Sequence, residues 1–252
     1  NVIGTKNVLA ACINAGVGRL VFTSSASVVF SDADMAGVDE TVPYPEQPRS
    51  PYTATKAEAE RMVLAANGAM LKTLSLRPHL IWGPGDTQIV PRIIARARAG
   101  KIVRVGDGKN IIDATYIDNA AAAHLLAARA LTDNPRAPGR AYFISNGEPV
   151  NLWDFVNRIL ALAGIPPVRR GISKSTAVLL GTVIEKLHLT LRLSGEPRMT
   201  RFLAEELATT HWFDISAARR ELGYEPRVSM AEGLERLQSW LINGGGKPSG
   251  KG

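Results

Sequence analysis

Residues 2–23, VIGTKNVLAACINAGVGRLVFT, decide the fold class of this 252-residue chain. Val2–Ala15 has the length and composition of a helix, and Gly16 follows it, as is typical of a helix C-terminus. Arg19–Thr23 is short and largely apolar, which indicates a strand. A helix followed at once by a strand is the repeating unit of a parallel sheet with crossover helices. The stretch therefore predicts an α/β fold.

The same alternation continues on the C-terminal side of this stretch. Ser50 has the chemistry of an N-cap and Pro51 suits the first helical position, so we expect a helix from Pro51 to about Ala66. Further elements are expected as follows: strands at 73–76, 102–105, 113–117 and 141–145, helices at 90–99 and 119–131, and a loop at 77–86. We therefore predict a doubly wound, Rossmann-like parallel sheet.

The pattern changes after residue 150, where helices and loops replace the alternation. Three helices are expected there: 152–163, 175–191, and one that runs from the capping box Ser229–Glu232 to about residue 241. We expect a single unit, residues 1–242, made of a Rossmann part (about 1–85 and 111–150) and a smaller, mostly helical substrate-binding part (about 86–110 and 151–242). Residues 243–252, NGGGKPSGKG, are expected to form a flexible tail.

The composition excludes several classes of protein. Hydrophobic residues make up 45% of the chain and the mean hydropathy is −0.01, which indicates a soluble globular core. No apolar run approaches the roughly 20 residues that span a bilayer. The single cysteine, Cys12, favours a reducing compartment, so we expect a cytoplasmic protein. The four histidines are scattered along the chain, so no metal site is predicted.

The charge distribution and the chain start point in one direction. Residues 1–66 carry five basic and seven acidic side chains, although the whole chain has a net charge of +7. The chain begins at Asn1 and contains no Gly-x-Gly-x-x-Gly turn, which opens a dinucleotide-binding sheet. We therefore expect a Rossmann unit that lacks its N-terminal strands and is inactive by itself. Nucleic-acid binding is not expected, because the basic cluster 92–104 has no interleaved aromatic residues.

One constellation carries candidate chemistry. Tyr52 and Lys56 are four residues apart and share one face of the expected helix. A tyrosine with a pKa near 10 is a poor acid or base at neutral pH, and an adjacent ammonium group lowers that pKa by favouring the phenolate. Ser24 and Ser25 follow a predicted strand, at the end where ligands meet parallel sheets. The alternative interpretation is a surface Tyr–Lys pair and a Ser-rich turn, because the spacing alone is weak evidence.

Five motifs stand in order along the chain: NVIGT at 1–5, TSS at 23–25, PYTATK at 51–56, RPHLIWGPG at 77–85 and YIDN at 116–119. Together they resemble the extended short-chain dehydrogenase/reductases, in the 3β-hydroxysteroid dehydrogenase-like branch. Residues 105–118 are similar to sterol-4α-carboxylate 3-dehydrogenases. Three stretches are similar to bacterial 2-alkyl-3-oxoalkanoate reductases: YFISNGEP at 142–149, GEPRMTRF at 195–202 and THWF at 210–213.

The resemblance implies a role for each matching residue. Tyr52 would be the catalytic acid/base, Lys56 would assist it, and Ser25 would polarise the substrate oxygen, with Ser24 as the alternative. The implied cofactor is NAD or NADP. The residues implied to bind it are Asn1, Thr23, Ser24, Tyr52, Lys56 and Pro78. The residues expected to contact the substrate are Ser25, His79 and Trp82.

The implied activity is oxidation of a secondary alcohol, or reduction of a ketone, on a small hydrophobic substrate. Reduction of a 2-alkyl-3-oxoalkanoate is the first expectation, and oxidation of a 3β-hydroxysteroid or sterol-4α-carboxylate is the second. A nucleotide-sugar epimerase and a non-catalytic dinucleotide-binding protein stay open as alternatives. The amphipathic stretch 175–191 has three open interpretations: a lid over the substrate, a helix that rests on a membrane surface, or a helix that packs in the core. A homodimer is also open.

Overall fold

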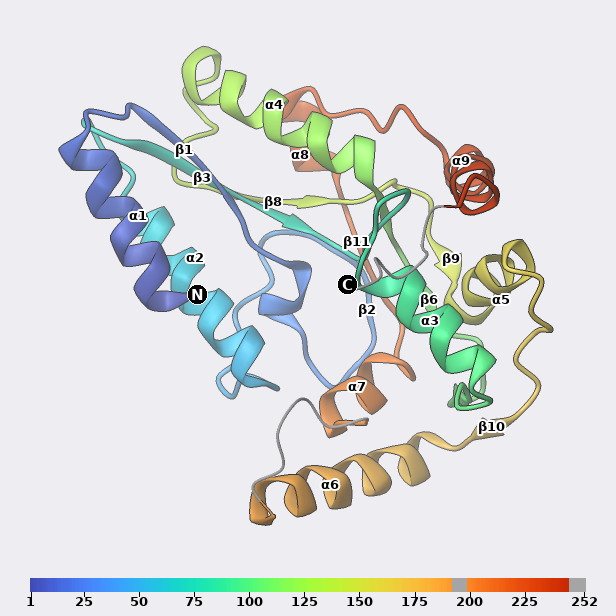
Figure 1. Cartoon of the computed structure of the whole chain (residues 1–252). Coiled ribbons are helices and arrows are strands. Elements are labelled where there is room, and N and C mark those ends of the chain that lie inside the picture. The colour runs from blue at the N-terminus through green and yellow to red at the C-terminus, as the bar shows by residue number, and fades with distance from the viewer. Residues whose placement is uncertain (192–198, 245–252) are drawn as a thin grey trace, which may run out of the picture.

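The computed structural model describes residues 1–191 and 199–244, and a parallel sheet runs through its centre (Figure 1). Three strands pair in the order β1-β3-β8: β1 (Arg19–Thr23), β3 (Lys72–Pro78) and β8 (Ala141–Ile144). Each face of this sheet is covered by two helices, α1 (Val2–Asn14) and α2 (Pro51–Ala65) on one face, α4 (Ile117–Asp133) and α8 (Ser216–Leu222) on the other. The chain is therefore an α/β protein with a doubly wound parallel sheet.

A second, mostly helical part lies beside this sheet (Figure 1). Its helices are α3 (Ile89–Arg98), α5 (Leu152–Leu162), α6 (Lys174–Thr190), α7 (Arg201–Glu206) and α9 (Met230–Ile242). Its longest sheet has the order β2-β11-β6-β9, formed by β2 (Met35–Val38), β11 (His211–Phe213), β6 (Ile111–Ile112) and β9 (Val150–Asn151). Two strand pairs complete it: β4 (Ile81–Trp82) with β7 (Thr115–Tyr116), and β5 (Arg104–Val105) with β10 (Gly171–Ile172).

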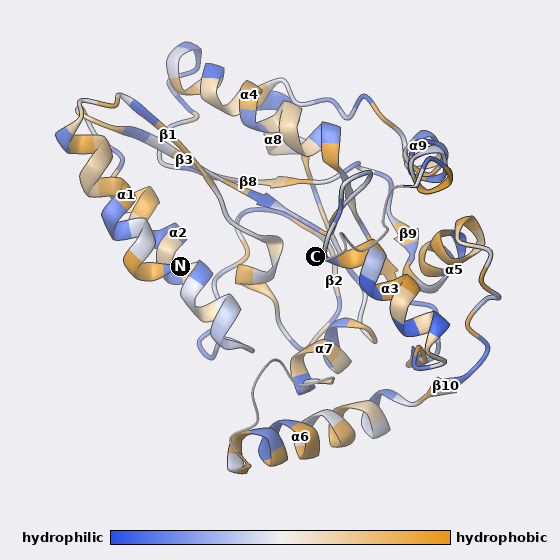
Figure 2. Cartoon of the chain, in the orientation of Figure 1, coloured by the Kyte–Doolittle hydropathy of each residue, from blue (hydrophilic) through white to orange (hydrophobic). Residues whose placement is uncertain are grey.

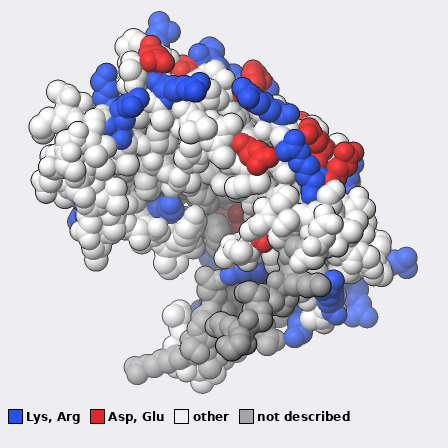
Figure 3. All heavy atoms as spheres, turned by 45° about the horizontal axis from the view of Figure 1, so that its top comes forward, with Lys and Arg blue, Asp and Glu red and all other residues white. Residues whose placement is uncertain are grey.

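Each part has its own hydrophobic core. The core around the parallel sheet includes Leu74, Leu76 and Phe143, and the helical part packs around Trp82 and Phe155. The helices that flank the sheet carry both hydrophobic and hydrophilic residues (Figure 2), and α1 leaves Ile3, Val8 and Ile13 exposed. On the face that Figure 3 presents, basic and acidic side chains intermingle. This face therefore lacks the single-sign basic patch that is typical of a nucleic-acid-binding surface.

Some boundaries differ from those expected from sequence. The strand predicted at 113–117 is shorter in the structure, where β7 covers only Thr115–Tyr116. Helix α4 begins at Ile117, and the negative charge of Asp118 in its first turn stabilises the positive end of the helix dipole. The strand predicted at 73–76 extends to Pro78, because Arg77 is accommodated inside the core. Among the described residues, nine short elements were not predicted, because they are too short to show periodicity: β2, β4, β6, β9, β10, β11, α7, α8 and the 3-10 helix η1 (Ala26–Val29). The expectation of a loop over 77–86 is therefore wrong at 77–78 and 81–82, which belong to β3 and β4.

A buried ion pair joins α2 to β3. The Arg77 guanidinium donates two hydrogen bonds to Glu60 Oε1, at 3.0 Å and 2.7 Å, and Glu60 is fully buried. Ser75 Oγ donates to Glu60 Oε2 at 2.7 Å and Tyr44 Oη donates to Oε1 at 2.6 Å. Burial opposes ionisation of Glu60, but these hydrogen bonds and the charge of Arg77 outweigh it and lower the pKa of Glu60. The carboxylate is thus satisfied inside the core.

Helix α6 packs against α7 at a close approach. A Cβ atom at Gly181 would lie 2.7 Å from the backbone carbonyl of Thr200, so the glycine lets the two elements meet. The outer face of α6 leaves five apolar side chains exposed: Leu179, Leu180, Val183, Leu187 and Leu189. Within residues 1–191 and 199–244, no helix is long and apolar enough to cross a membrane. The expected tail beyond residue 244, and residues 195–198 of the GEPRMTRF stretch, lie outside the described residues.

We expect Arg77→Met to lower the free energy of unfolding by about 3–5 kcal/mol, because it leaves the Glu60 carboxylate buried without its cation. Urea denaturation followed by circular dichroism measures the change. The matched control Ser75→Ala removes one hydrogen bond to the same carboxylate and should cost about 1 kcal/mol. Equal losses in the two variants would contradict this role of the ion pair.

Candidate active site

Lys56 is fixed where strand β1 ends. Its Nζ atom donates a hydrogen bond to the backbone carbonyl of Thr23 at 2.7 Å and lies 4.9 Å from the centroid of the Phe22 ring. Burial lowers the pKa of Lys56, and the negative charge of Glu60 opposes that shift. Helix α2 therefore brings Lys56 to the carboxyl end of β1.

Tyr52 lies one turn before Lys56 on α2. The helix start is rigid because Ser50 Oγ accepts from the Thr53 amide at 3.2 Å and Thr53 Oγ1 accepts from the Ser50 amide at 3.1 Å, which forms a capping box. The Tyr52 side chain is 50% exposed, so its phenol is open to a ligand. Asn1 lies beside the same turn, since its side-chain amide donates to Thr55 Oγ1 at 3.0 Å.

The two serines after β1 differ in their surroundings. Ser24 is buried, and its amide continues the sheet by donating to the Leu76 carbonyl at 2.7 Å. Ser25 caps η1, where its Oγ accepts from the Ser27 amide at 3.2 Å and lies 2.8 Å from Ser27 Oγ. Ser25 is the more accessible of the two and keeps a hydroxyl that can exchange partners. Its position favours Ser25 over Ser24 for contact with a substrate oxygen.

Two other predicted cofactor residues lie at the same edge of the sheet. Pro78 is buried at the end of β3. The Thr23 hydroxyl donates to His124 Nε2 at 2.8 Å, because His124 Nδ1–H is committed to the Ala120 carbonyl at 2.7 Å. The side chain of Thr23 is thus directed to α4, and its backbone carbonyl serves Lys56.

Two of the three residues predicted to contact substrate, His79 and Trp82, lie in the interior. His79 is 4% exposed, and its Nδ1 lies 2.6 Å from Asp113 Oδ1. Trp82 is 1% exposed and packs edge-to-face against Tyr116 and Phe155. Neither side chain is brought to the surface beside Tyr52, which is half exposed.

An apolar cavity of about 300 Å³ begins just beyond the end of β3. Helices α3, α5 and α7 supply most of its wall, through Ile93, Trp153, Val156, Leu203 and Leu207. Leu80 and Trp82 also line it, and Leu80 has a positive φ of 35°, a strained conformation that functional sites often retain. A cavity of this size and composition is typical of a site for a small apolar molecule. Trp82 therefore belongs to the cavity wall.

Sequence reasoning assigned no role to His211, which lines this cavity and is 2% exposed. Its Nε2–H donates to the Glu206 carbonyl at 2.9 Å, which leaves Nδ1 unprotonated and, among the described residues, without a hydrogen-bond partner. The rings of His211 and Phe30 pack at 4.6 Å between centroids, so η1 and the cavity are adjacent. The THWF motif at 210–213 contains His211, but the motif by itself does not indicate that this histidine lines a cavity.

The described residues contain no group of three or more His, Cys, Asp or Glu side chains that can hold a metal ion. The polar side chains at this edge of the sheet are instead a phenol, an ammonium group and hydroxyls. These groups transfer protons and bind oxygen atoms of organic ligands.

Comparison with known proteins adds the decisive observation. Residues 1–171 match the 3-beta hydroxysteroid dehydrogenase/isomerase family. Over 242 residues the chain is 54% identical to a 2-alkyl-3-oxoalkanoate reductase of Stenotrophomonas maltophilia, covering 95% of this chain and 73% of that protein. The chain belongs to the 3-beta hydroxysteroid dehydrogenase/isomerase family. The resemblance inferred from the five motifs is confirmed.

Other relatives belong to two kinds of enzyme. A 2-alkyl-3-oxoalkanoate reductase of Shewanella oneidensis is 45% identical, with 96% of this chain and 64% of that protein covered. A decarboxylating sterol-4-alpha-carboxylate 3-dehydrogenase of Schizosaccharomyces pombe is 41% identical, with 96% and 71% covered. The chain thus spans 64–73% of the length of these relatives.

Solved structures of the same fold include enzymes of sugar nucleotides. The crystal structure of gox2253 is 26% identical with a TM-score of 0.75, over 98% of this chain and 73% of that one. MoeE5 in complex with UDP-glucuronic acid and NAD is 27% identical with a TM-score of 0.67, over 97% and 71%. The predicted Rossmann-like fold is confirmed. The chain is an oxidoreductase of the 3-beta hydroxysteroid dehydrogenase/isomerase family.

The buried imidazole of His211 makes stability depend on pH. Burial lowers the pKa of His211 to about 3, and His79 contributes to the shift. An unfolded histidine has a pKa near 6.5. As the pH falls below that value, the unfolded state binds a proton that the folded state does not, so stability is lost.

We expect the wild-type chain to lose about 2 kcal/mol more stability between pH 7 and pH 5 than His211→Gln, in which this group does not titrate. Glutamine keeps a side-chain N–H for the Glu206 carbonyl. Denaturant titrations at both pH values measure the difference. Identical pH dependence in the two proteins would show that His211 is protonated in the fold.

Proposed function

We propose that this chain reduces the 3-oxo group of a 2-alkyl-3-oxoalkanoate with NAD(P)H. One observation supports the proposal: Lys56, one helical turn after Tyr52, donates to the Thr23 carbonyl at the carboxyl end of β1, two residues before Ser25. An apolar cavity begins just beyond the end of the neighbouring strand β3. The substrate class is supported by the two reductases of 54% and 45% identity. The small hydrophobic substrate then lies between the Rossmann part and the part at about 86–110 and 151–242.

The residues at the sheet edge fit the nicotinamide end of such a cofactor. The Lys56 ammonium group spends one donor on Thr23 and keeps two for ribose hydroxyls. Asn1 and Thr23 lie within the same group of residues, and Pro78 ends the neighbouring strand. When bound, the reduced nicotinamide supplies the hydride. Residues at the nicotinamide end would not reach the adenosine ribose, where NAD and NADP differ, so they would not select between the two cofactors.

The protein's own residues then handle the proton. The Tyr52 hydroxyl donates its proton to the carbonyl oxygen as the carbon becomes a secondary alcohol. The positive charge of Lys56 stabilises the phenolate that is left. Ser25 Oγ, now shared with Ser27, turns to donate a hydrogen bond to the same substrate oxygen. Solvent returns the proton to Tyr52, since that side chain is half exposed.

A second candidate function uses the same residues on a different substrate. The relative from Schizosaccharomyces pombe supports oxidation of a sterol-4α-carboxylate, in which Tyr52 would accept the proton of the 3-hydroxyl group. Exposed leucines on α6 support contact with a membrane surface, from which either substrate can be taken.

The acid/base assignment predicts that Tyr52→Phe in the full-length protein lowers kcat by at least about a hundredfold. Cofactor affinity should stay within about threefold, because the phenyl ring and Lys56 remain. Stopped-flow and steady-state absorbance at 340 nm measure turnover, and fluorescence titration measures cofactor binding. Ser27→Ala, which removes only the resting partner of Ser25, is the matched control. Equal turnover by Tyr52→Phe and the wild type would refute the assignment.

The substrate assignment predicts that Ile93→Trp, which fills the cavity, raises KM for a long-chain 2-alkyl-3-oxoalkanoate by about tenfold or more. KM for a 2-methyl-3-oxobutanoate, which does not reach the cavity, should change little. The same kinetic series with a sterol-4α-carboxylate completes the comparison. Turnover of the sterol and none of the oxoalkanoates would replace the first function by the second.

A further inference from the structure

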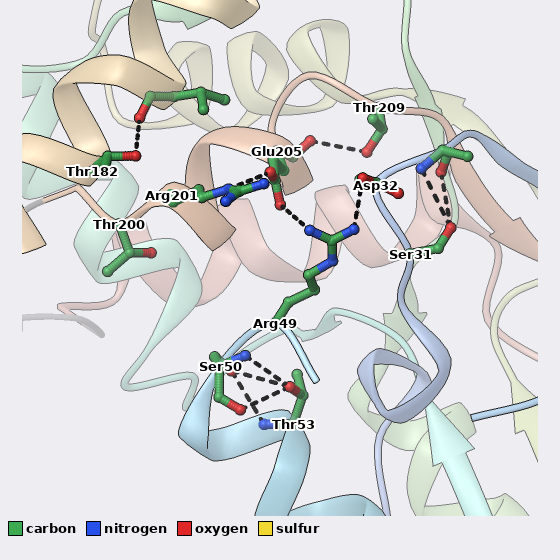
Figure 4. A network of polar contacts seen from close by, with 12 residues as sticks. Ser31, Asp32, Arg49, Ser50, Thr53, Thr182, Thr200, Arg201, Glu205 and Thr209 are labelled. Atoms are coloured by element: carbon green, nitrogen blue, oxygen red, sulfur yellow. Dashed lines mark hydrogen bonds and ion pairs between the residues drawn. The ribbon is translucent and has the colours of Figure 1, made fainter. Parts of the chain in front are cut away.

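A network of charged side chains joins the substrate-binding part to the start of the catalytic helix. Arg49 NH2 lies 2.7 Å from Asp32 Oδ2, and Arg49 NH1 lies 3.8 Å from Glu205 Oε2 (Figure 4). Arg201 Nε donates to Glu205 Oε1 at 2.9 Å within α7. The carboxylate of Glu205 thus lies between two guanidinium groups and is 9% exposed.

The course of the backbone gives Arg49 its position. After Ser25 the chain leaves the sheet edge, and β2 pairs in parallel with β11 of the substrate-binding part. It returns at Arg49, which directly precedes the N-cap Ser50 of α2. Arg49 therefore stands one residue before the capping box and three before Tyr52.

Helix α7 presents two faces to these neighbours. Glu205 and Arg201, four residues apart, form the face in the charged network. Leu203, together with Leu207 at the C-cap just after the helix, lines the apolar cavity. A molecule that fills the cavity presses on the leucine face, and a helix of this length moves as one body.

We propose that Arg49 is a positioning residue that couples occupation of the apolar cavity to the placement of Tyr52. The inference rests on the proposed function, because it needs a substrate whose alkyl chain reaches α7. A filled cavity holds α7 in place, α7 holds Arg49 through Glu205, and Arg49 holds the first turn of α2. The energy of binding the substrate's alkyl chain in the cavity thereby helps to place Tyr52 beside the reacting carbonyl group, which raises kcat.

The partial burial of this link makes it effective. Arg49 is 25% exposed in its side chain and Glu205 9%, so water screens the pair less than it screens a surface ion pair. Asp32 is 61% exposed and serves to orient the guanidinium group. A planar guanidinium group can bridge two carboxylates at fixed angles, which an ammonium group cannot do.

The experiment compares kcat for a long-chain and a short-chain 2-alkyl-3-oxoalkanoate in the full-length protein. In the wild type the long-chain substrate should have the higher kcat. Arg49→Met should lower kcat for the long chain about tenfold and for the short chain less than about twofold, so that the advantage disappears. Arg49→Lys should keep part of the long-chain advantage in kcat that Arg49→Met loses. Arg201→Met, which touches Glu205 but not α2, should retain the advantage.

Two outcomes of the kinetics would overturn the inference: equal losses on both substrates, which indicate a general structural role, or an unchanged advantage in Arg49→Met. If the wild type reduces no oxoalkanoate, the proposed function fails by itself. Hydrogen–deuterium exchange then tests the link without any substrate. Arg49→Met should speed amide exchange in both 51–54 and 201–207, and unchanged exchange in either segment would refute the coupling.

Discussion

The buried ion pair between Glu60 and Arg77 sets the depth at which α2 packs on the sheet. An uncompensated carboxylate in this core would be very costly, so α2 and β3 keep their register as long as the pair is present. Along one stripe of α2, spaced by four residues, Glu60 is fully buried, Lys56 is half buried and Tyr52 is half exposed. Along this stripe α2 therefore passes from solvent into the core, from the accessible phenol of Tyr52 to the buried carboxylate of Glu60.

The helical part adapts this common sheet to its ligand. Proteins with the same fold have been solved with UDP-glucuronic acid, a highly polar molecule. In this chain the corresponding part surrounds a cavity with tryptophan, phenylalanine, isoleucine and leucine side chains. The fold alone therefore does not define the substrate.

Local patterns predicted the elements and residues that depend on neighbours in sequence. The Tyr52–Lys56 pair follows from helical spacing, and the capped start of α2 follows from Ser50 and Pro51. Contacts between distant residues left no such pattern. Arg49 meets Glu205 across 156 positions of sequence, and Asp113 receives the amide of Phe213 across 100, so neither partner is visible locally. The contact of His79 with Asp113 is likewise invisible in the sequence, since 34 positions separate the two residues.

The acceptor that holds Lys56 is a backbone carbonyl, which every amino acid supplies. Evolution can therefore exchange the side chain at position 23 without releasing the lysine, provided that the strand keeps its register. Replacing Thr23 would remove its hydroxyl contact with His124 Nε2 but would leave the backbone carbonyl that holds Lys56. A lysine anchored in this way keeps its place while the side chains around it change.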